Sequence, residues 1–138
     1  MDMEVKDIPV RTLMVGDWAY IKEDPMKYEL KQVKPEHFVR SLCWFKPVPI
    51  TDDILEKNGF VYTKQKRWMS EADEKVWKIE NNYKQYTVEL ENTETDSGRP
   101  FYILKAASGV QYAELYIWYV HELQQVIRLL SIDKSITL

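Results

Sequence analysis

The stretch YIWYVHELQQVIRLL, residues 116–130, is the longest run of helical periodicity in the chain. A helix over these residues would have a polar side, formed by His121, Gln125 and Arg128, and an apolar side. At about 100° per residue, the apolar positions share one face of a helix. The pattern predicts an amphipathic C-terminal helix that packs on a β-sheet. The apolar positions recur at steps of four, three, four and three residues: Tyr116, Val120, Leu123, Ile127 and Leu130.

The dipeptide His121-Glu122 is the feature of this helix that is closest to a catalytic motif. A zinc-protease helix needs a second histidine one turn after the first, with the glutamate as base. Gln125 stands at that position, and the only other histidine is His37. We therefore predict no metal site, no cofactor and no catalytic residue. We expect His121, Gln125 and Arg128 to form a polar stripe that faces solvent or contacts a partner.

The composition is that of an ordinary globular protein, with 138 residues, 45% of them apolar and 30% charged. The net charge is −3 and the basic residues are scattered among acids, which disfavours nucleic acid as a partner. Aromatic residues make up 13% of the chain. Because so many rings cannot all enter one small core, we expect some at a rim, a groove or a subunit interface.

A single cysteine, Cys43, excludes an intrachain disulfide. It lies in the apolar stretch SLCWF, which favours a buried thiol over a nucleophile. The first ten residues, MDMEVKDIPV, lack the pattern of a secretory signal, and no apolar run is as long as a membrane span. These features predict a cytoplasmic protein without a membrane partner.

Residues 1–48 are expected to form a small β module. Short aromatic and β-branched runs at residues 18–21, 28–33 and 41–46 indicate strands, with turn signals between them. Three or four short strands in about forty residues suggest an SH3-like curled sheet or barrel. The prolines of residues 47–49 then form a stiff extended connector.

Residues 49–138 are expected to form an α+β module, joined with the first into one compact unit. A short helix begins after Thr51, whose side chain can cap the free amides, and Asp52 and Asp53 favour its first turn. Gly59 can adopt the left-handed conformation that ends a helix, and Phe60 can then fold back on Leu55 as the hydrophobic contact of the cap.

Antiparallel hairpins follow this helix. Residues 75–80 and 83–91 are predicted to pair through a two-residue turn at 81–82, a register that sets Trp77 opposite Tyr86. Further elements are expected as follows: turns at residues 64–67, 96–98 and 108–109, strands at 68–69 and 101–105, a strand or helix lead-in at 110–115, and a terminal strand at 136–138.

Three segments resemble a group of short hypothetical proteins of bacterial genomes, many of them in prophages and other mobile elements. The segments are the opening Gly16-Asp17-Trp18, the connector and helix PVPITDDILEKNGF at residues 47–60, and YVHELQQVIRLL at residues 119–130. The resemblance implies an architecture and a mobile-element setting, but no activity. Some related helices carry histidine where this chain has Gln125, and its absence here weakens a metal role.

Three functions remain open from the sequence. The first is a non-catalytic interaction module that binds a protein partner or another copy of itself. The second is a hydrolase-type enzyme that uses His121 or His37 with a carboxylate such as Glu122. The third is a nucleic-acid-associated protein whose exposed aromatic rings stack on bases.

Overall fold

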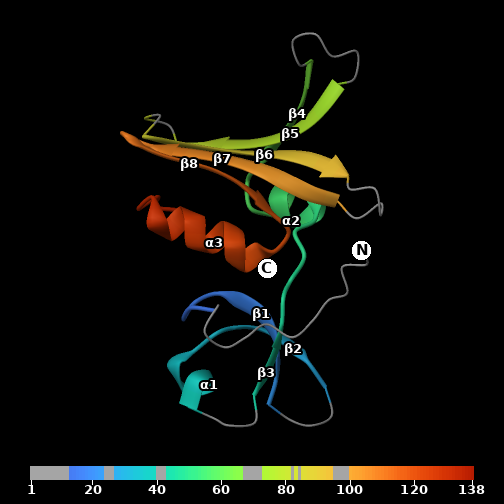
Figure 1. The fold of residues 1–138 in the computed structure, drawn as a ribbon, viewed down its shortest axis with the longest axis vertical. Helices are drawn as coiled ribbons and strands as arrows, with labels where there is room; N and C mark the ends of the chain where they lie inside the picture. Colours follow the sequence, from blue (N-terminus) through green and yellow to red (C-terminus); the bar gives the residue numbers. More distant parts are fainter. Residues whose placement is uncertain are drawn as a thin grey trace.

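A computed structural model describes residues 13–23, 27–39, 43–66, 73–81, 83, 85–94 and 100–138. These residues form two antiparallel sheets and three helices, so the predicted α+β class is confirmed (Figure 1). The predicted turn at residues 96–98 and the predicted strand at residues 68–69 lie outside the described residues.

The small sheet has the strand order β2-β1-β3. Its elements are β1 (Trp18–Lys22), β2 (Glu29–Gln32) and β3 (Trp44–Lys46), with the short helix α1 (Pro35–Val39) between β2 and β3. The three predicted strands are therefore present where the chain is described, and α1 was not predicted. One face of the sheet has its own apolar core, made of Leu13, Ala19, Ile21, Val33 and Phe45.

The large sheet is a meander in which each strand pairs with the next along the chain. Residues 64–66 continue β4 and do not form the predicted turn, and residues 110–115 are mostly strand. Lys64 is exposed, as is common for a residue of a strand at the edge of a sheet. The strands are β4 (Val61–Lys66), β5 (Asp73–Glu80), β6 (Tyr86–Glu94), β7 (Pro100–Ser108) and β8 (Gln111–Ile117).

The β5–β6 hairpin exists, but its predicted register is wrong by four residues. Trp77 lies opposite Leu90 and not Tyr86. The connection spans residues 81–85, because Asn81 closes a wider loop: its Oδ1 accepts the backbone N–H of Gln85 at 2.6 Å. A shift by an even number of residues leaves each side chain on its predicted face of the sheet.

The helix α2 (Asp52–Lys57) matches its prediction. The Thr51 hydroxyl accepts the N–H of Ile54, and Gly59 takes the left-handed conformation with φ 85°. The N–H of Phe60 then donates to the carbonyl of Leu55, which completes the glycine cap. Every signal for this helix is local, so the sequence alone was sufficient to place it.

The C-terminal helix α3 (Val120–Leu129) starts later than predicted. Tyr116, assigned above to the apolar helical stripe, belongs to β8 and is 62% exposed. The helix is started by Glu122, whose Oε1 accepts the backbone N–H groups of Trp118 and Tyr119 at 3.0 and 2.9 Å. The side chain that caps this helix therefore lies within its first turn.

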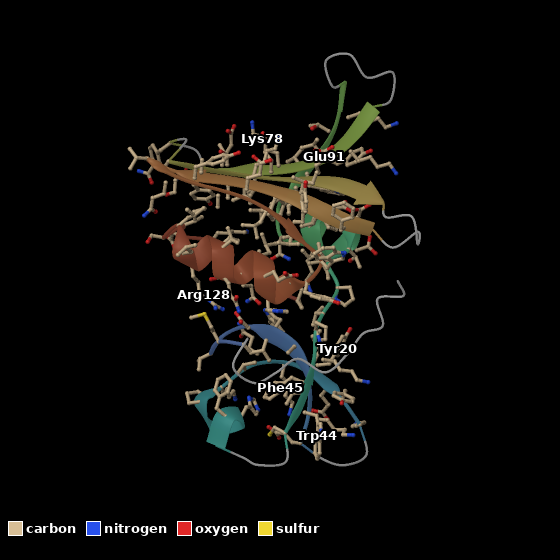
Figure 2. All side chains as sticks on the ribbon, in the orientation of Figure 1. Tyr20, Trp44, Phe45, Lys78, Glu91 and Arg128 are labelled. Carbon is tan, nitrogen blue, oxygen red and sulfur yellow. The ribbon has the colours of Figure 1, made fainter. Side chains whose placement is uncertain are left out.

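The helix α3 forms a middle layer between the two sheets (Figure 1). Its residues Val120, Leu123 and Ile127 share one core with residues of the large sheet, such as Leu90 and Leu104. In Figure 2, Arg128 projects from α3 toward the small sheet, whereas Lys78 and Glu91 project from the far face of the large sheet. The predicted polar stripe is therefore covered in part: His121 is buried, Gln125 is half-buried and Arg128 is exposed.

Two extended segments complete this arrangement. The connector pairs with the start of α3, since Ile50 N–H donates to the carbonyl of Trp118 and Val120 N–H to that of Val48. Residues 136–138 do not form the predicted strand. Instead, the backbone N–H and carbonyl of Thr137 form hydrogen bonds with the Asn58 side chain at 2.7 and 2.9 Å. The Asn58 amide thus satisfies both backbone groups of Thr137, as a residue of a paired strand would.

Candidate functional site

Asp17 is the centre of the junction between the small sheet and α3. Its side chain is fully buried, and Arg128 forms an ion pair with its Oδ1 at 2.5 Å. Its Oδ2 accepts hydrogen bonds from Gln125 Nε2 and from the backbone N–H of Met14, each at 2.9 Å. A buried carboxylate needs such partners to offset its lost hydration. The junction is thus held by charge and hydrogen bonding.

Gln124 supplies a second link across this junction. Its Oε1 accepts the backbone N–H of Trp18 at 2.8 Å, and its Nε2 donates to the carbonyl of Gly16 at 3.1 Å. The side-chain amide therefore bonds to the small sheet as a peptide group would. The sequence pattern did not single out Gln124, because a glutamine on a helix usually faces water.

Two of the three residues predicted as a contact stripe meet at Asp17. Gln125 and Arg128 bond to it directly, within the same chain. His121 is 8% exposed and stacks on the ring of Tyr119, with 5.8 Å between ring centroids. Burial lowers the pKa of His121, although the carboxylates of Glu122 and Asp17 act in the opposite direction. A role of this stripe in contacting another molecule stays a prediction.

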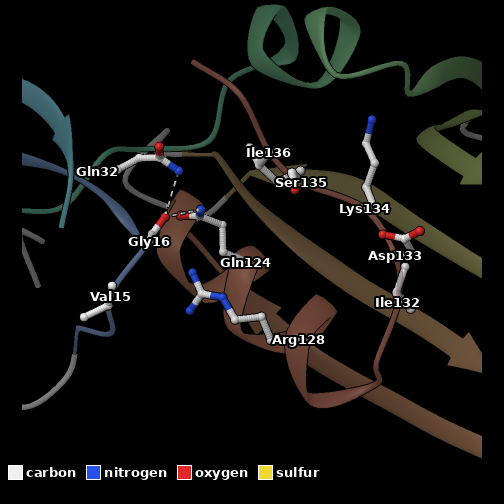
Figure 3. A pocket seen from close by; sticks show the side chains of 10 residues that line it. All are labelled: Val15, Gly16, Gln32, Gln124, Arg128, Ile132, Asp133, Lys134, Ser135 and Ile136. Carbon is white, nitrogen blue, oxygen red and sulfur yellow. Dashed lines mark hydrogen bonds between the residues drawn. The ribbon is translucent and has the colours of Figure 1, made fainter. Parts of the chain in front are cut away.

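A cavity of about 340 Å³ opens at the same junction (Figure 3). Figure 3 shows the amides of Gln32 and Gln124 both reaching the carbonyl of Gly16. Arg128, on another wall, is paired with Asp17. Because Gln124 and Arg128 already bond to the small module, this cavity lies at the contact between that module and α3. Its other walls come from Val15 and from residues 132–136 of the C-terminal segment.

The second histidine, His37, has a structural role in the small module. It is buried, its Nδ1 accepts the backbone N–H of Lys34 at 2.9 Å, and its Nε2 lies 2.6 Å from Glu23 Oε1. Both ring nitrogens are therefore engaged in holding α1 to the end of β1. A general base needs a nitrogen free to take a proton from the reacting group, and this arrangement provides none at His37.

Neither a cluster of metal ligands nor a membrane-spanning helix is present among the residues that the structure describes. Among these residues, no three side chains of His, Cys, Asp or Glu are grouped so that they could hold a metal ion. No described helix is long and apolar enough to cross a membrane. Cys43 is half-buried and packs against the core of the small sheet.

The second candidate site lies along β4, at the edge of the large sheet. Only β5 pairs with β4 among the described strands, so one side of its backbone is unpaired there. A hollow flanks the strand on each face of the sheet. The α2-side hollow, of about 550 Å³, is lined by Asp52, Glu56, Phe60, Val61, Tyr62, Lys75 and Trp77. The outer hollow, of about 240 Å³, is lined by Gly59, Val61, Thr63, Lys78, Ile79 and Glu80.

Aromatic rings and a carboxylate form the wall of the α2-side hollow. Tyr62 lies opposite Trp77 across the strands, with ring centroids 5.2 Å apart and planes tilted by 58°. Asp52 Oδ1 accepts three hydrogen bonds, from Trp77 Nε1 at 3.1 Å, Tyr102 Oη at 2.9 Å and Asn92 Nδ2 at 3.3 Å. These bonds fix the Trp77 ring and anchor the start of α2 on the sheet.

The hydroxyl of Tyr102 acts only as a donor in this cluster. Burial raises the pKa of Tyr102 far above its ordinary value, and its hydrogen bond to the Asp52 carboxylate raises it further. Asp52 and Glu56 stand one turn apart on α2 and are both exposed. The α2-side hollow therefore presents carboxylates beside aromatic faces.

The sequence indicated only fragments of this site. Asp52 was interpreted as a residue that favours a helix start, and residues 64–67 as a turn. The aromatic excess did predict rings at a groove or rim, and Tyr62, at the α2-side hollow and 37% exposed, fits that expectation. The approach of α2 to β4 depends on long-range packing, for which the sequence pattern carries no local signal.

Comparisons of the chain with protein-family models, with curated proteins and with solved structures give no match. The groups at the Asp17 junction join parts of one chain, whereas the hollows along β4 are open. The β4 edge is therefore the place where the described structure has binding groups to offer.

Proposed function

We propose that this protein is a non-catalytic interaction module that binds an extended segment of a protein partner along β4. The observation that carries the proposal is an edge strand that pairs with only one of the described strands and has a hollow on each face. An added strand gains main-chain hydrogen bonds from such an edge, and its side chains alternate between the two faces. Each of those faces has a hollow here.

The exposed half of β4 supports this proposal. Proteins usually protect a sheet edge with charges, prolines, bulges or a covering segment. Val61 is 64% exposed and Tyr62 37% exposed, so the first half of β4 presents apolar surface. Further along the strand, the exposed Lys64 places a charge at the edge. An edge that is left apolar beside two hollows is suited to a partner.

The chemistry-bearing side chains elsewhere support a non-catalytic role. Asp17, Gln125 and Arg128 join the small sheet to α3, and His37 joins α1 to Glu23. These groups therefore act as the frame that holds the large sheet and its edge. An enzyme built on His37 would have to break bonds on which the small module depends.

The wider setting is also a proposal. The resemblance described above supports a place in a prophage or other mobile element, with the partner in the cytoplasm. A protein partner is favoured over nucleic acid because Asp52 and Glu56 line the larger hollow and would repel phosphate. The three-stranded sheet with its own core is consistent with an SH3-like curl in the N-terminal module.

Affinity capture with matched variants tests the proposal. Val61→Lys adds a charge at the β4 edge, and Val110→Lys adds the same charge at the fully exposed turn between β7 and β8. Intact-mass measurement of complexes from a bacterial lysate should show one partner, or a second copy of the chain, with the wild type and with Val110→Lys but not with Val61→Lys. Equal capture by Val61→Lys, or no association by the wild type, would overturn the proposal.

A further inference from the structure

We infer that the segment bound along β4 places an arginine or lysine side chain in the α2-side hollow and a β-branched apolar side chain, at the neighbouring position, in the outer hollow. This inference rests on the proposed strand addition at β4 and names the sequence that such a strand would carry. It follows from the charge and shape of the two hollows.

The charge of the α2-side hollow selects a cation. Its lining holds two carboxylates, Asp52 and Glu56, against one ammonium group, Lys75. The three hydrogen bonds to Asp52 all go to Oδ1, and Oδ2 accepts none from the described residues. A carboxylate oxygen and the carboxylate of Glu56 are therefore available to a basic side chain that enters from the edge.

The aromatic wall favours the same ligand. A guanidinium or ammonium group is attracted to the face of a tryptophan or tyrosine ring within about 6 Å of its centroid. The Trp77 ring is buried and held in place by Asp52, and the Tyr62 ring beside it, 37% exposed, offers the aromatic surface that a ligand can reach. Arginine suits this wall better than lysine, because its planar fork stacks on a ring and bonds a carboxylate through two N–H groups.

The outer hollow selects a different side chain. Val61 and Thr63 give it apolar lining from β4, and Ile79, which also packs against the main core, lines it from β5. Its two charged lining residues, Lys78 and Glu80, lie 3.9 Å apart as an ion pair, and Lys78 is also 3.7 Å from Glu89. Because neighbouring residues of a strand point to opposite faces, a strand that sets its basic residue over α2 sets the next residue here.

The register between the two hollows is fixed by β4 itself. Tyr62 belongs to the α2-side hollow and Thr63 to the outer one, while Val61 borders both. The two hollows therefore lie at successive positions of one edge, and a bound strand would carry its basic and its apolar residue at adjacent positions. A segment with an acidic residue at the basic position would meet Asp52 and Glu56.

Selection of random twelve-residue peptides displayed on phage, with the full chain as bait, tests this inference. Selected peptides should share an arginine or lysine next to valine, isoleucine or threonine. In a synthetic copy of the strongest peptide, replacement of the arginine by citrulline keeps the shape and removes the charge. Fluorescence polarisation should show binding weakened about tenfold or more, since a hydrogen bond to a charged group is worth about 1.5–3 kcal/mol.

Matched protein variants locate the effect. Glu56→Gln should weaken the arginine peptide about two- to fivefold, as expected for an exposed ion pair, and leave the citrulline peptide unchanged. Glu36→Gln, at an exposed position of α1, should change neither. A circular dichroism spectrum equal to that of the wild type shows that each variant is folded.

The outcomes separate this inference from the proposed function. Peptides that bind the wild type but not Val61→Lys, and that lack a shared basic residue or bind equally with citrulline, overturn the inference and leave strand addition standing. Peptides that bind Val61→Lys as well as the wild type, or a selection that enriches none, overturn both. Binding of a single-stranded oligothymidine that displaces the peptide would also overturn the inference, because phosphate requires a cationic site.

Discussion

Asp17 Oδ1 and Arg128 Nη2 lie 2.5 Å apart, although the two residues stand near opposite ends of the chain. This pair joins the small sheet to α3, and Gln124 and the connector make further links to the same helix. Residues 16–18 and the connector at residues 47–50 therefore both contact α3 or its first turn.

Arg128→Met should destabilise the protein by about 3 kcal/mol. The substitution leaves a fully buried carboxylate without its cation, and loss of one partner of a buried pair costs about 3–5 kcal/mol. The lower end applies because the Arg128 side chain is 35% exposed and water screens part of the interaction. Urea unfolding followed by tryptophan fluorescence measures the change. The double variant with Asp17→Asn should recover part of the loss, and a loss below about 1 kcal/mol in Arg128→Met would contradict the role given to the pair.

Stability should fall as the pH decreases below about 6.5 because of His121. Burial lowers its pKa in the folded state, whereas the unfolded chain keeps the ordinary value of about 6.5. The unfolded state therefore binds the proton first, and the stabilising contribution, full above pH 6.5, is lost as pH falls through the lowered pKa. His121→Phe keeps a ring against Tyr119 and removes the titration. The difference in unfolding free energy between wild type and variant should change between pH 7.5 and 5.5, and a constant difference would rule out this origin.

Tyr102→Phe should cost about 1.5 kcal/mol, near the lower end for a hydrogen bond to a charged group. The Tyr102 hydroxyl is a buried donor to Asp52, which also accepts a hydrogen bond from Trp77 in the α2-side hollow. Tyr116→Phe is the matched control, since that side chain is largely exposed. Thermal or urea unfolding of the two variants should differ by about this amount. Equal stabilities would show that Asp52 does not depend on the Tyr102 bond.

The parts of this fold that sequence predicted well are those whose causes are local. Thr51 and Gly59 fix α2 within a few residues of themselves, and the structure has both in the predicted roles. The β5–β6 register failed because a two-residue turn at Asn81-Asn82 fits the local pattern, whereas the real loop is closed by an Asn81–Gln85 contact. The prediction that Tyr116 belongs to the helix was wrong for a similar reason. Its spacing fits a helix, but pairing with Ile103 on β7 keeps it in a strand.

The candidate site was least predictable, because it is made by segments that approach only in the folded chain. Asp52 lies in the first turn of α2, where a carboxylate is expected. No neighbouring residue in the sequence indicates that Trp77 and Tyr102 are its hydrogen-bond partners. The polar stripe of α3 shows a second limit of sequence patterns. Amphipathicity shows which residues avoid an apolar core, but it does not show that Gln125 and Arg128 also bond to Asp17 in a polar junction.

Asn58→Ala should release the C-terminal segment from the body of the protein. The Asn58 side chain holds both backbone groups of Thr137, and Ile136 beside it is buried in the main core. Its loss leaves buried polar groups without partners, which costs about 1–3 kcal/mol. Hydrogen exchange at the Thr137 amide should accelerate strongly while the amides of α3 stay protected. Because Trp18 Nε1 also donates to the Ile136 carbonyl at 2.8 Å, a second variant, Trp18→Phe, should loosen the same segment from its other side. Unchanged exchange at Thr137 in both variants would mean that apolar packing alone fixes this end of the chain.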